Sequence, residues 1–362
     1  MKISLLTLHS QNNNFGSVLQ AYSLYSYLQE LGHDVTIINY QPYYSNGAKS
    51  PQMLIKKLIT NIVFLPQYIK RSYNFDKILK LEKKTPKYTK YSELQEMRGA
   101  YDVYFIGSDQ VWNPNYLCGK DPAYTLSFIE GNNKISYAAS IGTEKISEEQ
   151  ICELVARIKE FKYLSLRENN SVLMLRKAGR KDAEFVLDPV FLHDRAYYRQ
   201  IAAKPRQNGY ILAYIIHKDQ FIADVVKMIA QKTNKKVIQI GGFAAKCDYD
   251  IFDRTAGPCE FLGLIDNADF VITSSFHGLA FSHIFEKQFS VVMPYDNILR
   301  LENILEVFGT QDRVIKKLED VELELNQKID YSSVNLKIAA LRSKSCDFLE
   351  KNLKRIEGES IC

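Results

Sequence analysis

The chain has 362 residues, of which 46% are apolar and 25% charged, a balance typical of globular proteins with roughly two to three domains. Its 47 basic and 42 acidic residues leave a net charge of +5, which is too small for a chain of this length to indicate nucleic acid as a partner. An aromatic fraction of 12% and only 10 prolines exclude an intrinsically disordered protein.

The six cysteines are spread singly along the chain, without a CxxC pair and without a histidine at zinc-ligand spacing. This pattern is typical of reduced thiols in a cytosolic protein. The apolar run at the N-terminus, about six residues long, is far shorter than the core of a signal peptide or a membrane span. We therefore expect a cytoplasmic protein.

The first part of the chain has the order strand, loop, helix, glycine, strand. Residues 3–8 are largely apolar, as in a strand that is buried on both faces of a parallel sheet, and an Asn-rich loop follows. Apolar residues then recur at helical spacing until Gly32, which predicts the end of a helix, and residues 35–40 predict the next strand. Together these elements predict a βαβ unit.

The same alternation continues in two further series, separated by the Pro-containing stretch 202–209. The first has strands expected at 102–109, 134–140 and 163–168 and a helix at 147–161. The second has strands expected at 210–216, 236–242, 269–275 and 289–294, with helices near 219–232, 259–266 and from 277. We therefore expect an α/β protein with two Rossmann-like, doubly wound domains that face a cleft, where ligands bind at the carboxyl ends of the strands.

We place the first domain at residues 1–200 and the second at 201–330. Between 331 and 357, apolar residues recur at helical spacing among lysines and arginines. Residues 331–362 are therefore expected to form a C-terminal helix that packs back on the first domain.

One segment, residues 54–90, interrupts the alternation with ten basic and two acidic residues among Leu, Ile, Phe and Tyr. A basic amphipathic helix of this kind is typical either of a solvated insertion, here 50–95, or of a surface that binds anionic lipid. In the second case each cation near the membrane contributes about 1 kcal/mol. Both interpretations stay open.

The most informative motif is Thr-Ser-Ser-Phe-His-Gly at 273–278, between an expected strand and the helix that follows it. His277 is then expected at a helix N-terminus inside the cleft, where the helix dipole and free backbone N–H groups favour phosphate or carboxylate. Ser274 and Ser275 are candidates to donate hydrogen bonds to that anion or to cap the helix. An imidazole beside an anion has a raised pKa and is a candidate general acid; the alternative is a structural histidine.

Arg167 ends an apolar strand in the sequence Ser-Leu-Arg-Glu and is expected to point into the same cleft. Its guanidinium group suits bidentate binding of carboxylate or phosphate. The alternatives are an ion pair with the neighbouring Glu168 or a surface position.

Two loops complete the candidate site. Ser108 and Asp109 follow a strand, and Asp109 can orient or deprotonate a hydroxyl group or, alternatively, cap a turn. The loop that contains Asn12, Asn13 and Asn14 lies at another strand end and is placed to hydrogen-bond a sugar, although asparagines also simply form turns.

Several chemical motifs are absent from the chain, among them GxGxxG, GxxxxGK[ST], GxSxG and HExxH, which excludes most dinucleotide, P-loop, hydrolase and zincin functions. One Asp-x-Asp pair, Asp248 and Asp250, is of a type that can hold a divalent cation. It has no evident third ligand, so we interpret it as an acidic loop and expect no metal site.

In their order, these motifs resemble the polysaccharide pyruvyl transferase family along nearly the whole chain. As a set the motifs are specific, whereas each one alone is weak. The resemblance is carried by LHSQNNNFGSVLQAYSLYSYLQELG, DVYFIGSDQVWNP, YAASIG, SLRE, FVLDPVFL, GPCEFLGLIDNADFVITSSFHGLAFSHIF and KQFSVV. It implies a fold like that of GT-B glycosyltransferases and the transfer of a pyruvyl group from phosphoenolpyruvate onto two hydroxyls of one sugar, as a ketal.

By the same resemblance, His277 is the family's proposed general acid and Arg167 is the arginine that holds phosphoenolpyruvate. Many members carry an arginine two residues before the histidine, where this chain has Ser275, and some carry a lysine about twenty residues beyond it. We expect Arg300 to supply the missing charge. The first domain would bind the acceptor and the second the donor.

The resemblance thus implies phosphoenolpyruvate and a sugar of a capsular, cell-wall or exopolysaccharide precursor as substrates, and no cofactor. For a lipid-linked acceptor, the basic segment 54–90 would hold the protein at the inner face of the membrane. Two alternatives stay open: a GT-B glycosyltransferase that uses a nucleotide sugar, and a catalytically silent carbohydrate-binding homologue, since fold alone does not select the chemistry.

Overall fold

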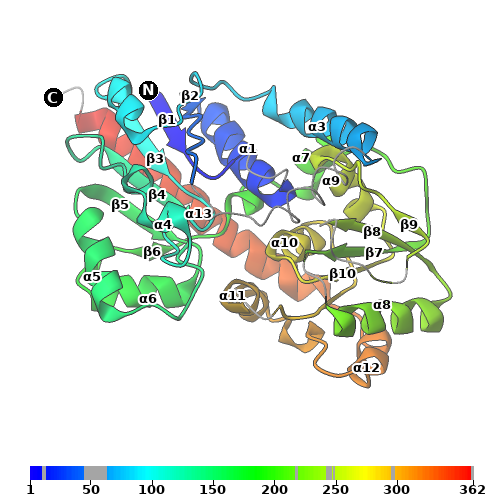
Figure 1. The fold of residues 1–362 in the computed structure, drawn as a ribbon. Helices are drawn as coiled ribbons and strands as arrows, with labels where there is room; N and C mark the ends of the chain where they lie inside the picture. The colour runs from blue at the N-terminus through cyan, green and yellow to red at the C-terminus, as the bar shows by residue number, and fades with distance from the viewer. Residues whose placement is uncertain are drawn as a thin grey trace, which may run out of the picture.

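The computed structural model describes residues 1–9, 14–44, 63–216, 219–241, 247, 249–294 and 298–359. Its strands form a six-stranded and a five-stranded sheet, and the strands within each sheet pair in parallel. Helices cover the faces of both sheets (Figure 1). The two-domain α/β fold that the strand–helix alternation predicts is confirmed.

The six-stranded sheet has the spatial order β2-β1-β3-β4-β5-β6. β3 and β4 are buried along their whole length, as expected for apolar strands with covered faces. The strands are β1 (Lys2–Leu6), β2 (Asp34–Ile37), β3 (Val103–Ile106), β4 (Lys134–Ala139), β5 (Phe161–Leu166) and β6 (Glu184–Phe185). The helices of this half are α1 (Phe15–Glu30), α3 (Leu65–Leu79), α4 (Leu117–Lys120), α5 (Glu148–Arg157), α6 (Asn169–Lys177) and α7 (Arg195–Ile201).

The five-stranded sheet has the spatial order β11-β10-β7-β8-β9. Its strands are β7 (Tyr210–Ile215), β8 (Lys236–Gly241), β9 (Ile251–Phe252), β10 (Phe270–Thr273) and β11 (Phe289–Val291). The helices that follow these strands are α8 (Gln220–Thr233), α9 (Pro258–Asp266), α10 (Phe276–Ile284), α11 (Ile298–Phe308) and α12 (Asp320–Asn326).

Strand β3 ends at Ile106, earlier than the predicted end at residue 109. Gly107 and Asp109 have φ angles of 109° and 67°, which do not continue a strand. A Cβ atom on residue 107 would lie 2.3 Å from the carbonyl oxygen of Tyr137, so this turn requires glycine. The turn leaves Ser108 and Asp109 at the carboxyl end of the sheet.

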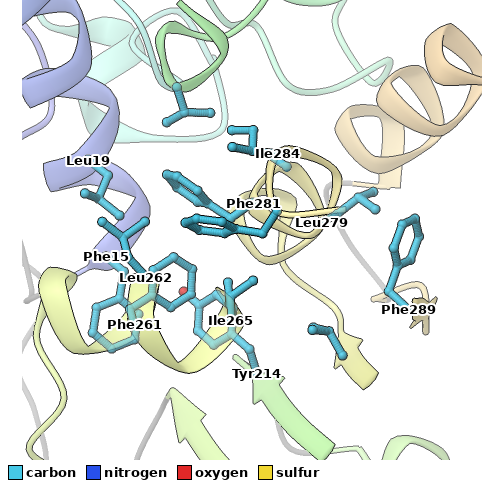
Figure 2. Packing of buried hydrophobic residues seen from close by; sticks show 14 of the residues in the cluster. Phe15, Leu19, Tyr214, Phe261, Leu262, Ile265, Leu279, Phe281, Ile284 and Phe289 are labelled. Carbon is cyan, nitrogen blue, oxygen red and sulfur yellow. The ribbon is translucent and has the colours of Figure 1, made fainter. Parts of the chain in front are cut away.

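An aromatic core joins the two halves of the molecule. Phe15, the first residue of α1, stacks on Phe261 of α9 with ring centroids 4.9 Å apart. Figure 2 shows both rings next to Phe281 of α10 and Tyr214 of β7. Because Phe15 is only 1% exposed, this packing fixes the start of α1 against α9 and α10.

Helix α13 (Tyr331–Glu359) runs along both domains (Figure 1). Val334 and Ile338 in its first half pack in the core that joins the two halves. Phe348 and Leu349 in its second half pack in the core that contains β1 and β2. The prediction that a C-terminal helix packs back on the first domain is therefore confirmed.

The predicted insertion at 50–95 contains α3, which packs against α9 of the second domain. The side-chain nitrogen Nδ2 of Asn74 donates to the carbonyl oxygen of Thr255 at 2.8 Å, and Nη1 of Arg71 donates to that of Ala256 at 3.2 Å. An insertion in the first half of the chain thus contacts the second half. Lys56 and Lys57 lie outside the described residues.

Part of the positive charge of this segment is compensated within the protein. Arg71 is only 6% exposed and lies over the Phe15 ring, 4.9 Å from its centroid. Lys77 pairs with Glu260 at 2.7 Å. Lys70 and Lys80, in contrast, are exposed. Among the helices of the described ranges, none combines the length and the apolar character needed to cross a membrane.

Candidate active site

Two helix N-termini, one from each domain, meet at the carboxyl ends of the two sheets. Ser275 is the N-cap of α10, and its side-chain oxygen accepts the backbone N–H of Gly278 at 3.5 Å. Asn14 is the N-cap of α1, and its side-chain oxygen accepts the N–H of Gly16 at 3.0 Å. The positive ends of both helix dipoles therefore favour an anion between them.

His277 lies in the first turn of α10, against the first turn of α1. Its ring is buried, with 7% of the residue exposed, and a Cβ atom on Gly16 would lie 1.9 Å from Nδ1. The Nε2 atom is buried and has no hydrogen-bond partner among the described residues, and Oδ1 of Asp188 is 3.9 Å away. A buried ring nitrogen without a partner is a candidate contact for a ligand atom or for water.

Burial lowers the pKa of His277 to about 4, with Arg167 acting in the same direction and Asp188 in the opposite one. The imidazole is therefore neutral at pH 7 in the unliganded protein. The raised pKa that the sequence predicts for a histidine beside an anion thus depends on the arrival of that anion.

Arg167 follows β5 and is buried among three carboxylates. Its guanidinium nitrogens lie 2.6 Å from Asp188, 3.2 Å from Glu168 and 3.3 Å from Asp109. Burial alone would lower the pKa of Arg167, but these carboxylates together raise it. The sequence presents an inward position of Arg167 and an ion pair with Glu168 as alternatives. In the structure Arg167 is buried and also pairs with Glu168.

Ser108 and Asp109 lie beside Arg167. The Oγ atom of Ser108 is 3.0 Å from Oε1 of Gln20 and 3.3 Å from Oδ2 of Asp188. Burial acts to raise the pKa of Asp109, but Arg167 and Arg300 hold it below its ordinary value. Asp109 is therefore an ionised hydrogen-bond acceptor at neutral pH.

Arg300 reaches the same cluster from α11. The guanidinium carbons of Arg167 and Arg300 lie 4.8 Å and 6.0 Å from the ring centroid of Phe276. When the side-chain amide of Gln110 is oriented so that both its oxygen and its nitrogen have hydrogen-bond partners, the oxygen accepts from Nη2 of Arg300 at 2.8 Å. The structure thus brings Arg300 and Arg167 to one aromatic ring.

The remaining predicted residues lie at the two helix starts or outside the described residues. The Oγ atom of Ser274 is buried without a hydrogen-bond partner in the described part of the chain. Ser275 and Asn14 cap their own helices, which agrees with the structural alternative for both. Asn13, like Asn12, falls outside the described residues.

Three residues of the cluster were not predicted as site residues: Asp188, Glu168 and Gln20. Asp188 interrupts the apolar run Phe-Val-Leu-Asp-Pro-Val-Phe and is 2% exposed, and a charged residue within such a run is a signal for a buried ion pair. Gln20 is fully buried on α1, where its Nε2 donates to the hydroxyl of Thr7 at 3.0 Å. Its signal is weaker, because glutamine is common on helices.

The described residues contain no group of three His, Cys, Asp or Glu side chains arranged to hold a metal ion. Of the Asp-x-Asp pair, Asp248 lies outside the described residues. The carboxylate of Asp250 accepts the backbone N–H of Val237 at 2.7 Å, as expected for a residue that organises a loop.

The fold resembles that of a UDP-N-acetylglucosamine 2-epimerase and of a UDP-bound protein, at low sequence identity. The UDP-GlcNAc 2-epimerase of Rickettsia bellii has a TM-score of 0.52 and 10% identity, with 98% of each chain covered. The S. aureus MnaA–UDP complex has a TM-score of 0.51 and 9% identity, with 98% of this chain and 97% of the other covered. These similarities establish the GT-B-like, two-domain α/β fold and nothing about substrate.

Sequence comparison identifies the family. No curated protein matches the chain. The model of the family described as polysaccharide pyruvyl transferase matches residues 14–297, a range that begins at the N-cap of α1, includes Arg167, Asp188 and His277, and ends before α11. With most of its length matched, including Asp109, Arg167, Asp188 and His277, the chain belongs to the polysaccharide pyruvyl transferase family.

Proposed function

We propose that the protein transfers the pyruvyl group of phosphoenolpyruvate onto two hydroxyls of one sugar in a polysaccharide or lipid-linked precursor and forms a pyruvate ketal. The observation that carries this proposal is the buried Nε2 atom of His277, which lacks a partner within the described residues at the meeting point of two helix N-termini. Such a position suits a proton donor to a small, highly charged anion.

Phosphoenolpyruvate carries a phosphate and a carboxylate, and the site offers positive charge for both. The N-termini of α1 and α10 present backbone N–H groups, and Ser274 offers a buried hydroxyl without a described partner. Among the described residues, three carboxylates lie within ion-pair distance of Arg167 and none within that distance of Arg300, so we assign direct contact with the donor to Arg300 first. Arg167 would bind the donor while held in place by Asp188 and Glu168.

In the proposed reaction, protonated His277 gives its proton to the methylene carbon of phosphoenolpyruvate, which makes C2 electrophilic. The first sugar hydroxyl attacks C2, the bond from C2 to the phosphate oxygen breaks, and the second hydroxyl closes the ketal. The two hydroxyls lose two protons: one replaces the proton that became part of the new methyl group, and the other leaves with inorganic phosphate. No oxidant or reductant is required.

Asp109 is the candidate that orients or deprotonates the attacking hydroxyl. The Arg167 contact at 3.3 Å and the lowered pKa keep this carboxylate ionised and fixed. The acceptor would therefore approach from the carboxyl end of the first sheet, where Asp109 follows β3. We place the reaction in the cytoplasm, at the inner face of the membrane if the acceptor is lipid-linked.

Thermal stability with ligands tests the donor. Phosphoenolpyruvate at 100 times its Kd should stabilise the protein by about 2.7 kcal/mol, and UDP-, GDP- and CMP-linked sugars should not stabilise it. The shift should disappear in Arg300→Ala and Arg167→Ala. A shift with a nucleotide sugar alone would instead favour a glycosyltransferase, and sugar binding without any phosphate release would favour a silent carbohydrate-binding homologue.

Measurements of turnover test whether His277 is the proton donor. His277→Ala should lower the rate of phosphate release in the presence of acceptor by about 10² to 10⁴, the usual range for a lost acid–base catalyst. His33→Ala is the matched control, because His33 lies outside the site and near Glu357 of α13. Near-full activity of His277→Ala would reject His277 as the proton donor.

A further inference from the structure

The outward face of α3 is apolar. Leu65, Ile69 and Tyr73 follow one another at intervals of four residues and are 52%, 61% and 63% exposed. Residues at this spacing lie on one side of a helix. Val63 before the helix and Leu81 after it are also exposed, to 62% and 53%.

The opposite face of α3 is fixed to the protein. Phe75 and Ile78 are buried in the core, and Asn74 and Arg71 donate to backbone carbonyls of the segment before α9. The apolar side chains on the outside are therefore not a consequence of loose packing. α3 lies along the outside of the molecule, beyond α7 and α9 (Figure 1).

Positive charge borders the apolar face. On a helix of 3.6 residues per turn, Lys70 and Lys77 lie beside the apolar row, and Lys80 follows the last turn. Asp76, the single acidic residue in Leu65–Leu79, comes three residues after Tyr73 and lies at the C-terminal end of the apolar row, and Lys77 is partly neutralised by Glu260 at 2.7 Å. An apolar centre with a basic border is complementary to a surface that presents acyl chains below anionic headgroups.

We propose that the outward face of α3 docks the protein on an anionic lipid bilayer. Leu65, Ile69 and Tyr73 would enter the boundary between headgroups and acyl chains, with the exposed lysines at the phosphate level. The inner face of the same helix stacks Phe75 on Phe15, 5.4 Å apart, and Phe15 precedes the Gly16 that packs on His277. Docking through α3 would therefore hold the candidate active site close to a lipid-linked acceptor. This surface contains none of the residues of the candidate active site, and its binding to lipid does not depend on the donor.

Vesicle co-sedimentation of the full chain tests this surface. We expect binding to vesicles of phosphatidylcholine with phosphatidylglycerol, weaker binding to phosphatidylcholine alone, and a decrease with added salt. Leu65→Ser with Ile69→Ser should lower partitioning by about tenfold or more, because two exposed apolar side chains are lost. Lys70→Glu with Lys80→Glu should lower binding to the anionic vesicles only.

Matched controls distinguish vesicle binding through this surface from nonspecific vesicle binding. Leu323→Ser with Leu336→Ser removes two apolar side chains that are 63% and 74% exposed elsewhere, and Lys236→Glu with Lys344→Glu reverses two exposed charges elsewhere. These controls should bind vesicles as the wild type does. Equal losses in test and control variants, equal binding to neutral vesicles, or no binding at all would overturn the proposal.

Two further measurements distinguish a failure of the membrane proposal from a failure of the proposed reaction. If light scattering finds a wild-type oligomer that Leu65→Ser with Ile69→Ser dissociates, and vesicles are not bound, the face belongs to a protein interface and the membrane proposal is wrong. Phosphate release with a soluble acceptor is measured on the same proteins and should not change in these variants. Vesicle binding without phosphate release would reject the proposed reaction and leave the docking surface intact.

Discussion

Gly16 of α1 and His277 of α10 are in direct contact across the two domains: a Cβ atom on residue 16 would lie 1.9 Å from Nδ1 of the imidazole. Because residue 16 has no side chain, the first turn of α1 packs directly against the imidazole of His277, which lies in the first turn of α10. This contact places the imidazole where both helix N-termini act on its ligand. Its geometry also indicates how the site can be disturbed without touching the histidine.

Gly16→Ala should displace the imidazole and lower turnover toward the level of His277→Ala, a loss of about 10² to 10⁴. Overpacking of this kind should cost about 1 to 3 kcal/mol of stability, measured by urea unfolding. Gly358→Ala is the control, because a Cβ there meets nothing within 4 Å. Full activity of Gly16→Ala would show that the ring position does not matter for the reaction.

Phosphoenolpyruvate binding at pH 7 should take up about one proton. Burial lowers the pKa of His277 to about 4 in the free protein, so the ring is neutral until a trianionic ligand raises its pKa. Calorimetry in two buffers of different ionisation enthalpy measures this uptake. His277→Gln should bind phosphoenolpyruvate without it, and the same uptake in both proteins would contradict the role of His277 as acid.

Asp188→Asn should destabilise the protein by about 3 to 5 kcal/mol, because it leaves the buried guanidinium of Arg167 with less compensating charge. The comparable change at the surface is Asp182→Asn: Asp182 pairs with Arg180 at 2.7 Å but its side chain is 50% exposed, so its loss should cost at most about 1 kcal/mol. Urea unfolding of both variants gives the comparison. Equal costs would mean that the Asp188 carboxylate is not the main support of Arg167.

Arg300→Lys should weaken phosphoenolpyruvate binding by about tenfold or more, since an ammonium group cannot reproduce the planar fork of a guanidinium. The Kd for phosphoenolpyruvate, from titration calorimetry, measures the effect. Arg195→Lys, at an exposed pair with Glu286, is the control and should leave the Kd unchanged. An unchanged Kd in Arg300→Lys would remove Arg300 from the donor site.

Two variants should change the pH dependence of stability with opposite signs. The folded-state pKa of His277 is lowered to about 4 from 6.5, so the wild type loses stability relative to His277→Gln as pH falls from 6.5 to 4, by up to about 3 kcal/mol. Burial raises the pKa of Glu82 to about 7 from 4.5. The wild type therefore loses stability relative to Glu82→Gln as pH rises from 4.5 to 7, by a similar amount. Urea unfolding at several pH values checks both slopes, and a flat difference curve would contradict the corresponding pKa.

Most of the secondary structure follows from local patterns in the sequence. Apolar runs and Gly32 predict β1, α1 and β2, and the turn from β10 to α10 places His277 at a helix start, because strand and helix periodicity depend on neighbouring residues. Local patterns do not predict that β3 ends at Ile106. This end depends on the close approach of the Tyr137 carbonyl to Gly107, which only the paired strand creates.

The basic segment shows the limit of composition as a guide. Ten basic residues between 54 and 90 predict a cationic surface. In the structure Arg71 is buried against Phe15, while Leu65, Ile69 and Tyr73 face outward. The side of an amphipathic helix that becomes buried depends on the part of the chain that packs against it. For α3 this part is the segment before α9, whose backbone carbonyls accept hydrogen bonds from Arg71 and Asn74.

By itself, the sequence determined the α/β alternation, the family resemblance, and the presence of His277, Arg167, Ser108 and Asp109 at strand ends. Parallel strands bring their carboxyl ends to one edge, so Arg167, Ser108 and Asp109 gather at that edge of the first sheet, and His277 lies at the corresponding edge of the second sheet. Only the tertiary structure decided that Asp188 holds Arg167, that Arg300 joins it over Phe276, and that Gly16 supports His277. These contacts join residues far apart in the chain, and their distances depend on how two domains pack, which no local pattern encodes.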